Sequence, residues 1–178
     1  MHHLFTDMQE DWLAGCSGRI TIFTCGGTID KIYFDAKSDY QVGDPNIKVV
    51  LDGMCLAVDY RVVSLLRKDS LDMTDADRQL IADAVRSAPD RHVVITHGTD
   101  TMVQTARAIT GIGDKVVVLT GAIQPAMFVT SDAVFNIGCA IAAAQTCAPG
   151  VYIAMNGRIF NPGQVRKNDE AGRFEETQ

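Results

Sequence analysis

The residues most able to do chemistry lie in three short segments, of which the first is Gly26-Gly27-Thr28. Its two glycines let the backbone turn sharply and leave room for a ligand close to the chain, and the Thr28 hydroxyl follows directly. The simpler interpretation is a tight turn with a solvent-facing threonine. The sequence contains no GxGxxG pattern, so no dinucleotide-binding loop is expected.

The second segment, His97-Gly98-Thr99-Asp100-Thr101, and the third, around Lys167, offer a base, a carboxylate and an amine. Thr99 or Asp100 could simply cap a helix, but the start of a helix also presents free N–H groups to an anion, and Asp100 could orient a neighbouring cation. His97 is the obvious base by residue type, yet a lone histidine beside a buried strand is more often a packed, hydrogen-bonded residue. Lys167 alone indicates only a charged loop.

Strands and helices that alternate along the chain must position these segments. Short β-branched runs predict strands at 20–23, 93–95, 116–119 and 151–154, with a more mixed run at 60–66. Apolar residues at helical spacing predict helices at about 74–88, 101–110 and 131–146, and helix is the preferred interpretation of the ambiguous 47–58. Thr74 and Asp77 form a shortened capping box at the first of these helices. The last helix is apolar nearly all round, so it is expected to be well buried.

This alternation predicts an α/β fold with a doubly wound, mostly parallel sheet flanked by helices. Ligands of such sheets bind beyond the carboxyl ends of the strands. Threonine followed by glycine occurs at the end of three predicted strands, including Thr120-Gly121-Ala122. We expect residues 19–178 to form a single domain and residues 1–18 a disordered leader.

Composition excludes several classes of protein. The 178 residues carry a net charge of −6 without a basic run, which disfavours nucleic acid and anionic membranes as partners. No stretch approaches the length of a membrane-spanning helix. The five cysteines form no CxxC or CxxH pair, so neither a disulfide framework nor a zinc site is expected, and a reducing cytoplasmic location is the simplest interpretation.

Together, these segments resemble the N-terminal domain of bacterial-type L-asparaginases, which hydrolyse asparagine to aspartate and ammonia with a threonine nucleophile. The matches follow one another along residues 19–168: Thr24-Cys25-Gly26-Gly27-Thr28-Ile29-Asp30, Lys68-Asp69-Ser70-Leu71-Asp72-Met73-Thr74, Ile95-Thr96-His97-Gly98-Thr99-Asp100-Thr101-Met102, Gly121-Ala122-Ile123-Gln124-Pro125 and Lys167. One glycine-glycine-threonine triplet is a weak signal, but five ordered matches are specific.

The resemblance implies a catalytic role for five residues. Thr28 would attack the side-chain amide carbon and form an acyl-enzyme, with Tyr40 polarising its hydroxyl. Thr99, Asp100 and Lys167 would form a supporting triad, and the Thr99 backbone N–H would help to stabilise the oxyanion. A threonine hydroxyl needs an adjacent base, and lysine can serve only when neutral. Burial favours the neutral form and Asp100 opposes it, so the sequence leaves the balance open.

The resemblance also implies a substrate-binding set. Ser70 and Asp72 would hold the α-carboxylate and the α-ammonium of asparagine, and the Ala122 carbonyl would accept a hydrogen bond from the leaving amide. Gly27 and Gly98 would line the same site. No metal and no cofactor are required by this chemistry.

Departures from the family pattern keep other functions open. Cys25, Leu71 and Gln124 stand where threonine, glutamine and arginine are usual, and the chain ends at Gln178 although family members continue into a second domain that completes a neighbour's site. An asparaginase-like domain that binds an acidic amino acid without turnover is therefore an alternative. The amidase unit of a tRNA-dependent amidotransferase is another, disfavoured by the net charge. We expect a homo-oligomer, most simply a dimer.

Overall fold

A six-stranded sheet organises the computed structural model, which describes residues 18–34 and 39–177. The predicted leader at 1–18 lies outside the described residues, except for Gly18. In spatial order the strands are β4 (Tyr60–Lys68), β1 (Ile20–Gly26), β5 (His92–Thr96), β6 (Val116–Thr120), β7 (Gly150–Met155) and β8 (Arg158–Phe160). The first five pair in parallel, and β8 is antiparallel to β7. The predicted α/β class with a mostly parallel sheet is confirmed.

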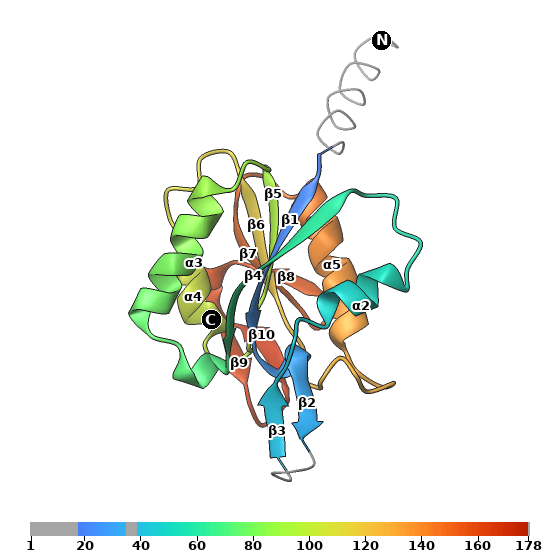
Figure 1. Ribbon diagram of the computed structural model, residues 1–178. Helices are drawn as coiled ribbons and strands as arrows, with labels where there is room; N and C mark the ends of the chain where they lie inside the picture. Colours follow the sequence, from blue (N-terminus) through green and yellow to red (C-terminus); the bar gives the residue numbers. More distant parts are fainter. Residues whose placement is uncertain (1–17, 35–38, 178) are drawn as a thin grey trace, which may run out of the picture.

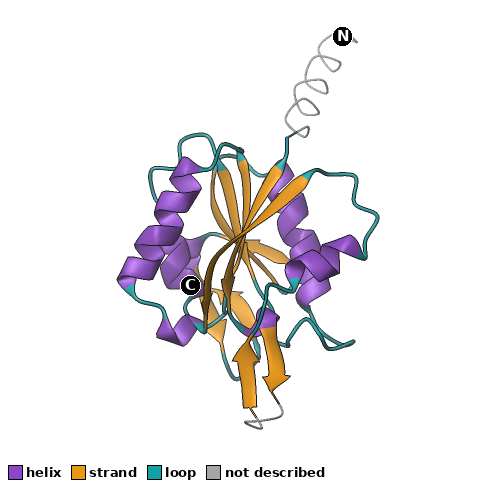
Figure 2. Cartoon of the chain, viewed as in Figure 1, coloured by secondary structure: helices purple, strands orange, loops and turns teal. Residues whose placement is uncertain are grey.

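Helices cover both faces of this sheet (Figures 1 and 2). On one face lie α3 (Asp75–Ser87) and α4 (Met102–Ala108), and on the other lie α2 (Ile47–Asp52) and α5 (Ala133–Thr146). Two hydrophobic cores result, because side chains alternate along each strand. In β1, Ile20 and Ile22 pack towards α5, whereas Phe23 and Cys25 pack towards α3. A strand buried on both faces is what its continuous apolar run predicts.

Local capping chemistry explains where α3 begins. The Thr74 hydroxyl accepts the Asp77 N–H at 3.3 Å, and the Asp77 carboxylate accepts the Thr74 N–H at 2.8 Å, so the predicted capping box is present. The ambiguous segment at 47–58 is helical only as α2, which ends at Asp52.

The expectation that the helix at 131–146 is well buried is only partly right. The inner face of α5 is buried, but Val134 and Phe135 are exposed at 45% and 59%. The physical reason is that α5 lies against one face of the sheet, and none of the described elements forms a further layer outside it (Figure 1). Apolar residues on the outer side of a helix therefore remain in contact with solvent.

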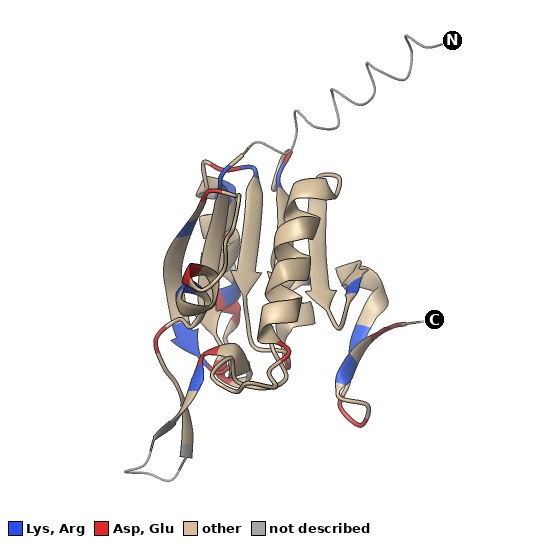
Figure 3. Cartoon of the chain, turned by 90° about the vertical axis from the view of Figure 1, so that its right-hand side faces the viewer, with Lys and Arg blue, Asp and Glu red and all other residues tan. Residues whose placement is uncertain are grey.

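Two small antiparallel pairs and three 3₁₀ turns complete the described structure. The pairs are β2 (Lys31–Phe34) with β3 (Asp39–Val42), and β9 (Val165–Asn168) with β10 (Arg173–Glu176). The turns are η1 (Thr28–Asp30), η3 (Ser70–Asp72) and η4 (Pro162–Gln164). Lys167 therefore lies on a strand, not in a charged loop. Charged residues gather at the ends of the sheet and on these hairpins, while α5 carries none (Figure 3). Within the described part of the chain, no helix is long and apolar enough to cross a membrane.

Candidate active site

The carboxyl ends of β4, β1, β5 and β6 meet at one edge of the sheet, at the lower end in Figure 1. Backbone hydrogen bonds join the segments that leave these strands. The Gly27 N–H donates to the Lys68 carbonyl at 2.9 Å, and the His97 N–H donates to the Thr120 carbonyl at 2.9 Å. All four strand-end segments matched in the sequence are thus adjacent, at the edge where parallel sheets bind ligands.

Two glycines allow these segments to touch. Gly27 has a φ of +90°, and a β-carbon built on it would overlap the Gly98 backbone. A β-carbon on Gly98 would lie 2.5 Å from the Ser70 Oγ. Neither position has space for a larger residue. The predicted site residues Gly27 and Gly98 therefore pack the turns of Thr28, Ser70 and Thr99 against one another.

Thr28 begins the 3₁₀ turn η1 and is its only partly exposed side chain, since Ile29 and Asp30 are buried. The Asp30 N–H donates to the Gly27 carbonyl at 3.1 Å, and the Ile29 carbonyl accepts the Ala126 N–H at 3.1 Å. The turn is therefore fixed from within and from the segment after β6. Its fixed backbone holds the partly exposed Thr28 at the carboxyl edge of the sheet.

Ser70 and Asp72 lie in η3, directly after β4. The Asp69 side chain caps this turn by accepting the Leu71 N–H at 3.1 Å, and it pairs with the Lys31 ammonium at 2.7 Å. Ser70 is fully buried and its Oγ has no hydrogen-bond partner, whereas Asp72 is exposed. A buried hydroxyl without a partner at this edge is a group that a ligand can satisfy.

Lys167 reaches the site from β9 and bonds to two carboxylates. Its Nζ lies 2.5 Å from an Asp100 oxygen and 3.0 Å from an Asp169 oxygen. Burial disfavours the charged ammonium, but the hydrogen bonds to Asp100 and Asp169 outweigh it, so the pKa of Lys167 lies above its ordinary value. This direction favours the ammonium form of Lys167. Thr99, the third member of the predicted triad, is buried next to Asp100.

Neither Thr99 nor Asp100 caps the helix that follows. The N-cap of α4 is Thr101, and no side chain makes a cap hydrogen bond there. The Thr101 hydroxyl instead donates to the Ser70 carbonyl at 2.7 Å, which ties the two turns together.

Tyr40 lies on the β2–β3 hairpin, which projects beyond the carboxyl edge of the sheet (Figure 1). Its exposed ring meets the Phe128 ring edge-on, with 6.3 Å between the ring centres. The base of the hairpin is anchored to η1, because the Gly43 N–H donates to the Asp30 carbonyl at 2.8 Å and the Asn46 N–H to the Asp30 Oδ1 at 2.8 Å. The structure thus places Tyr40 on an element that begins directly after the Thr28 turn.

Ala122 is buried in the segment that follows β6. The Asp132 carboxylate shapes this segment by accepting the Ile123 and Gln124 N–H groups at 3.0 and 3.1 Å. The Asn136 Nδ2 donates to the Gly121 carbonyl at 3.0 Å. The backbone around Ala122 is therefore fixed by side chains from the start of α5.

His97 has a structural environment. It is fully buried, its Nδ1 lies 2.8 Å from the Gly98 carbonyl, and its Nε2 lies 2.9 Å from the Thr105 Oγ1. Burial lowers the pKa of His97 to about 4, so the ring is neutral near pH 7. The interpretation of His97 as a packed, hydrogen-bonded residue is confirmed.

Sequence reasoning missed three polar residues of this region: Asp30, Asn136 and Asp169. Burial raises the pKa of Asp30 to about 6, although the Asn46 N–H and the charge of Arg67 act in the opposite direction. Asn136 is a polar residue on the buried face of an apolar helix, a signal that the sequence does contain. Asp169 lies just after β9, a strand that the pattern did not predict. Among residues 18–34 and 39–177, no three His, Cys, Asp or Glu side chains are grouped to hold a metal ion.

Comparison with known proteins shows which family this chain resembles. The family model described as Asparaginase, N-terminal, matches residues 19–174. The chain is 32% identical over 161 residues to L-asparaginase 2 of Escherichia coli (strain K12), covering 84% of this chain and 46% of that protein. It is 30% identical over 150 residues to one of the subunits of the glutamyl-tRNA(Gln) amidotransferase of Methanococcus maripaludis (strain C5 / ATCC BAA-1333), covering 78% of this chain and 35% of that protein.

A solved structure extends the likeness to three dimensions. L-asparaginase I from Vibrio cholerae O1 biovar eltor str. N16961 superposes with a TM-score of 0.76 at 30% identity, covering 89% of this chain and 51% of that one. The chain thus spans about half the length of the relatives it matches. On the family match and the shared fold, it belongs to the asparaginase family and corresponds to the family's N-terminal domain.

Proposed function

We propose that this chain hydrolyses the side-chain amide of L-asparagine to L-aspartate and ammonia. The observation that carries the proposal is the packing of the Thr28 turn, through Gly27 and Gly98, against the buried Ser70 hydroxyl that has no partner. This arrangement puts the partly exposed Thr28, the proposed nucleophile, close to a buried hydroxyl that can donate a hydrogen bond to a small anion. The charge-assisted pair of Asp100 and Lys167 adjoins the same edge.

In the proposed first step, the Thr28 oxygen bonds to the amide carbon and the carbon–nitrogen bond breaks. The hydroxyl proton leaves with the nitrogen as ammonia, and an acyl-enzyme ester remains. Water then cleaves the ester, which yields aspartate and restores the hydroxyl. We assign Tyr40 to polarise Thr28, and the Thr99 N–H to stabilise the oxyanion as a fixed donor.

Substrate binding in this proposal uses the groups around η3. Ser70 would hold the α-carboxylate and Asp72 the α-ammonium, since a carboxylate suits a cation and a hydroxyl suits an anion. The Ala122 carbonyl would accept a hydrogen bond from the amide that leaves. Gly27 and Gly98 allow the substrate to approach the backbone closely.

Lys167 acts in this proposal as a cation, because its two carboxylate partners favour the ammonium. Its charge, balanced by Asp100, would stabilise negative charge that develops near Thr99 in the transition state. A neutral lysine that removes the Thr28 proton would require the loss of both ion pairs. The proton of Thr28 is therefore assigned to the leaving nitrogen, and the Tyr40 hydroxyl would relay it by accepting it and passing its own proton on.

Ammonia release from asparagine, without ATP or tRNA, tests the function. Thr28→Ala should lower kcat by at least about a thousandfold, the usual consequence of removing a nucleophile. Thr28→Ser should retain partial activity, and Thr110→Ala, at an exposed site outside these turns, should match the unmodified protein. A Thr28→Ala variant that keeps more than a few per cent of kcat would refute the assignment.

Selectivity for asparagine over glutamine follows from the same anchors. If Ser70 and Asp72 fix the α-groups, the additional methylene of glutamine moves its amide carbon away from Thr28, and misplacement of about 1 Å can reduce the rate about a hundredfold. We expect kcat/KM for glutamine to be lower by that order. Comparable kcat/KM values for the two amides would show that the α-groups are held elsewhere.

Two other functions have distinguishable outcomes. A binding domain without turnover would bind aspartate in calorimetry and release no ammonia. The similarity to a subunit of a glutamyl-tRNA(Gln) amidotransferase favours the amidase unit of a tRNA-dependent amidotransferase as the second candidate, which would need tRNA for activity. The net charge of −6 argues against direct tRNA binding by this chain.

We also propose that the protein is a cytoplasmic homo-oligomer. The four described cysteines, Cys25, Cys55, Cys139 and Cys147, are free thiols, which suits a reducing compartment. A dimer is the simplest assembly that could supply further contacts to the α-groups of the substrate. Light scattering at micromolar concentration tests this, and a monomer mass together with full activity would contradict it.

A further inference from the structure

Two parts of the proposed site are brought in by elements far apart in the sequence. The segment with Ala122 follows β6, whereas Lys167 lies on the β9–β10 hairpin near the end of the chain. For the proposed reaction, both must hold a fixed position relative to the Thr28 turn. A chain of hydrogen bonds through two asparagine side chains joins them.

The first link is Asn136, a fully buried residue on α5. Its Nδ2 donates to the Gly121 carbonyl at 3.0 Å and to the Asp132 Oδ2 at 2.8 Å. Its Oδ1 accepts the Asn156 backbone N–H at 3.1 Å. The amide thus uses both its donors and its acceptor, and it ties the residue before Ala122 to the turn between β7 and β8.

The second link is Asn156, in the turn that joins β7 to β8. Its φ of +53° is a left-handed conformation that asparagine tolerates better than most residues. Its Oδ1 accepts the Phe174 N–H at 2.9 Å. Phe174 stands opposite Lys167 in the β9–β10 pair. The chain of contacts therefore runs from Gly121 to the residue paired with Lys167.

Other contacts hold the β9–β10 hairpin against the core beside α4. Val165 and Phe174 bury their side chains in the core beside α4, and the Arg107 Nε donates to the Pro162 carbonyl at 2.7 Å. These contacts are mainly apolar and hold the hairpin against α4 and the core, where Ile123 of the segment after β6 also packs. An aliphatic side chain at 136 would suit an apolar helix face, and an amide there is stabilised only when its hydrogen bonds are made.

We propose that Asn136 and Asn156 are positioning residues that fix the backbone around Ala122 and the Lys167 hairpin relative to each other. The proposal rests on the proposed function for its kinetic consequences. Its structural consequence is independent of turnover: loss of either link lets the hairpin shift, which lengthens the contact between Lys167 and Asp100. Longer contacts to carboxylates stabilise the ammonium less.

Asn156→Gly is the most informative variant, with Asn156→Asp as its matched control. Glycine tolerates the positive φ, so the change removes the Oδ1 acceptor without backbone strain. Aspartate retains an acceptor for the Phe174 N–H and tolerates the same φ. Asn136→Leu breaks the chain at the other link while it preserves an apolar helix face.

The first readout is the titration of the Lys167 ammonium, followed by its ¹³Cε resonance and assigned with Lys167→Arg. We expect Asn156→Gly and Asn136→Leu to lower the pKa of Lys167 by at least half a unit, and Asn156→Asp to restore it. This readout needs no activity. Identical titration in all four proteins would overturn the proposal, even if the variants unfold at lower temperature.

The second readout is the pair of kinetic constants kcat and KM, with asparagine as substrate. Asn156→Gly should reduce kcat about tenfold with KM within twofold, and Asn156→Asp should recover most of kcat. A kcat within twofold of the unmodified protein in Asn156→Gly would overturn the kinetic part. Absence of ammonia release by the unmodified protein would instead refute the proposed function, while the titration would still decide whether the two links position Lys167.

Discussion

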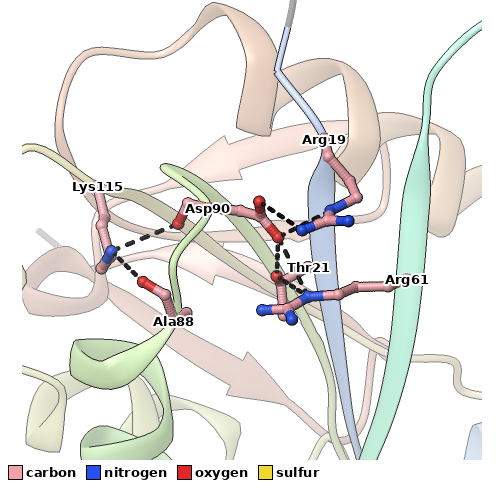
Figure 4. Close-up of polar contacts among 6 residues, drawn as sticks. All are labelled: Arg19, Thr21, Arg61, Ala88, Asp90 and Lys115. Carbon is pink, nitrogen blue, oxygen red and sulfur yellow. Dashed lines mark hydrogen bonds and ion pairs between the residues drawn. The ribbon is translucent and has the colours of Figure 1, made fainter.

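At the amino end of the sheet, buried polar groups bond to one another, whereas at the carboxyl end several have no partner. Figure 4 shows the amino end, where one carboxylate, that of Asp90, accepts from Thr21 at 2.5 Å and pairs with Arg61 at 3.1 Å and Arg19 at 3.4 Å. The Lys115 ammonium donates to two carbonyls nearby. Hydrogen bonds from Thr21 and Arg19 outweigh burial and lower the pKa of Asp90.

The carboxyl end presents the opposite arrangement. In the part of the chain that the structure describes, six buried side-chain atoms have no hydrogen-bond partner, and four lie at this end: Thr24 Oγ1, Asp30 Oδ2, Ser70 Oγ and Thr96 Oγ1. The exception at the amino end is His92 Nδ1, which lies against Gly18. Each such atom costs about 1–3 kcal/mol. Polar groups at one end of the sheet thus stabilise the fold, whereas under the proposed function those at the other end are available to the substrate.

Among the changes that test this contrast, Gly98→Ala should produce the largest effect and should act on the carboxyl end alone. The new methyl group would lie 2.5 Å from the Ser70 Oγ, so the turn with Ser70 and the turn with Thr99 must separate. We expect kcat/KM for asparagine to fall at least about a hundredfold, since small displacements of reacting groups have effects of this size. Steady-state ammonia release measures it. Activity within tenfold of the unmodified protein would show that the close contact of the turns is dispensable.

Asp90→Ala should destabilise the fold without changing the chemistry. It leaves the buried Thr21 hydroxyl and the Arg61 guanidinium without their common acceptor, and the free energy of unfolding should fall by about 2–3 kcal/mol. Urea denaturation gives this value, and kcat per folded molecule should be unchanged. Asp75→Ala, which breaks an exposed ion pair with Arg78, is the control and should cost less than about 1 kcal/mol. Equal losses in the free energy of unfolding would show that Asp90 contributes no more to stability than an exposed carboxylate does.

Asp30→Asn should stabilise the protein at neutral pH, in contrast to Asp90→Ala. The pKa of Asp30 is raised from 3.8 to about 6, so the folded protein holds this proton more tightly than the unfolded chain does. The contribution of Asp30 to the free energy of unfolding is therefore fully present below about pH 4, and it is lost as the pH rises through about 6. At pH 8 the neutral asparagine should raise the free energy of unfolding by roughly 1–3 kcal/mol, and below pH 4 the advantage should vanish.

Urea denaturation of the Asp30→Asn variant at pH 4 and pH 8 checks this sign. If the free energy of unfolding differs from that of the unmodified protein by the same amount at pH 4 and pH 8, the Asp30 carboxyl is not the titrating group.

Gly138→Ala should give the smallest effect and serves as the control for Gly98→Ala. Gly138 lies on the exposed side of α5, and a β-carbon there meets nothing within 4 Å. Alanine should stabilise the helix by about 0.5–1 kcal/mol and leave kcat unchanged. Thermal unfolding and ammonia release measure both quantities. A loss of activity here would undermine the attribution of the Gly98→Ala effect to local contact.

Features with local causes were predictable from the sequence. The capping box at Thr74 and Asp77 depends on residues three apart, and the strand ends follow from β-branched runs bounded by glycine. The rule that parallel strands present their carboxyl ends at one edge then predicted that Thr28 and Thr99 would be neighbours, and the resemblance to the asparaginase family added Ser70. The structure places them in turns that touch.

Features with tertiary causes were not predictable. The β9–β10 hairpin has mixed polar and charged residues, and its position depends on contacts with α4 and with Asn156. The charge of Lys167 depends on Asp169 as well as Asp100, and only the folded hairpin brings both within reach. Phe135 and other apolar residues on the outer side of α5 are exposed because the helix is covered on one side only. The spacing of apolar residues in the sequence does not show how many layers cover a helix.

The most direct test of the account is the detection of the acyl-enzyme on Thr28. Asparagine is mixed with the protein, the reaction is quenched with acid within milliseconds to seconds, and the digest is analysed by mass spectrometry. The account predicts that the peptide with Thr28 gains the mass of an aspartyl group, and that Thr28→Ala shows neither the adduct nor ammonia release. An adduct on another residue, or ammonia release by Thr28→Ala at the rate of the unmodified protein, would contradict it.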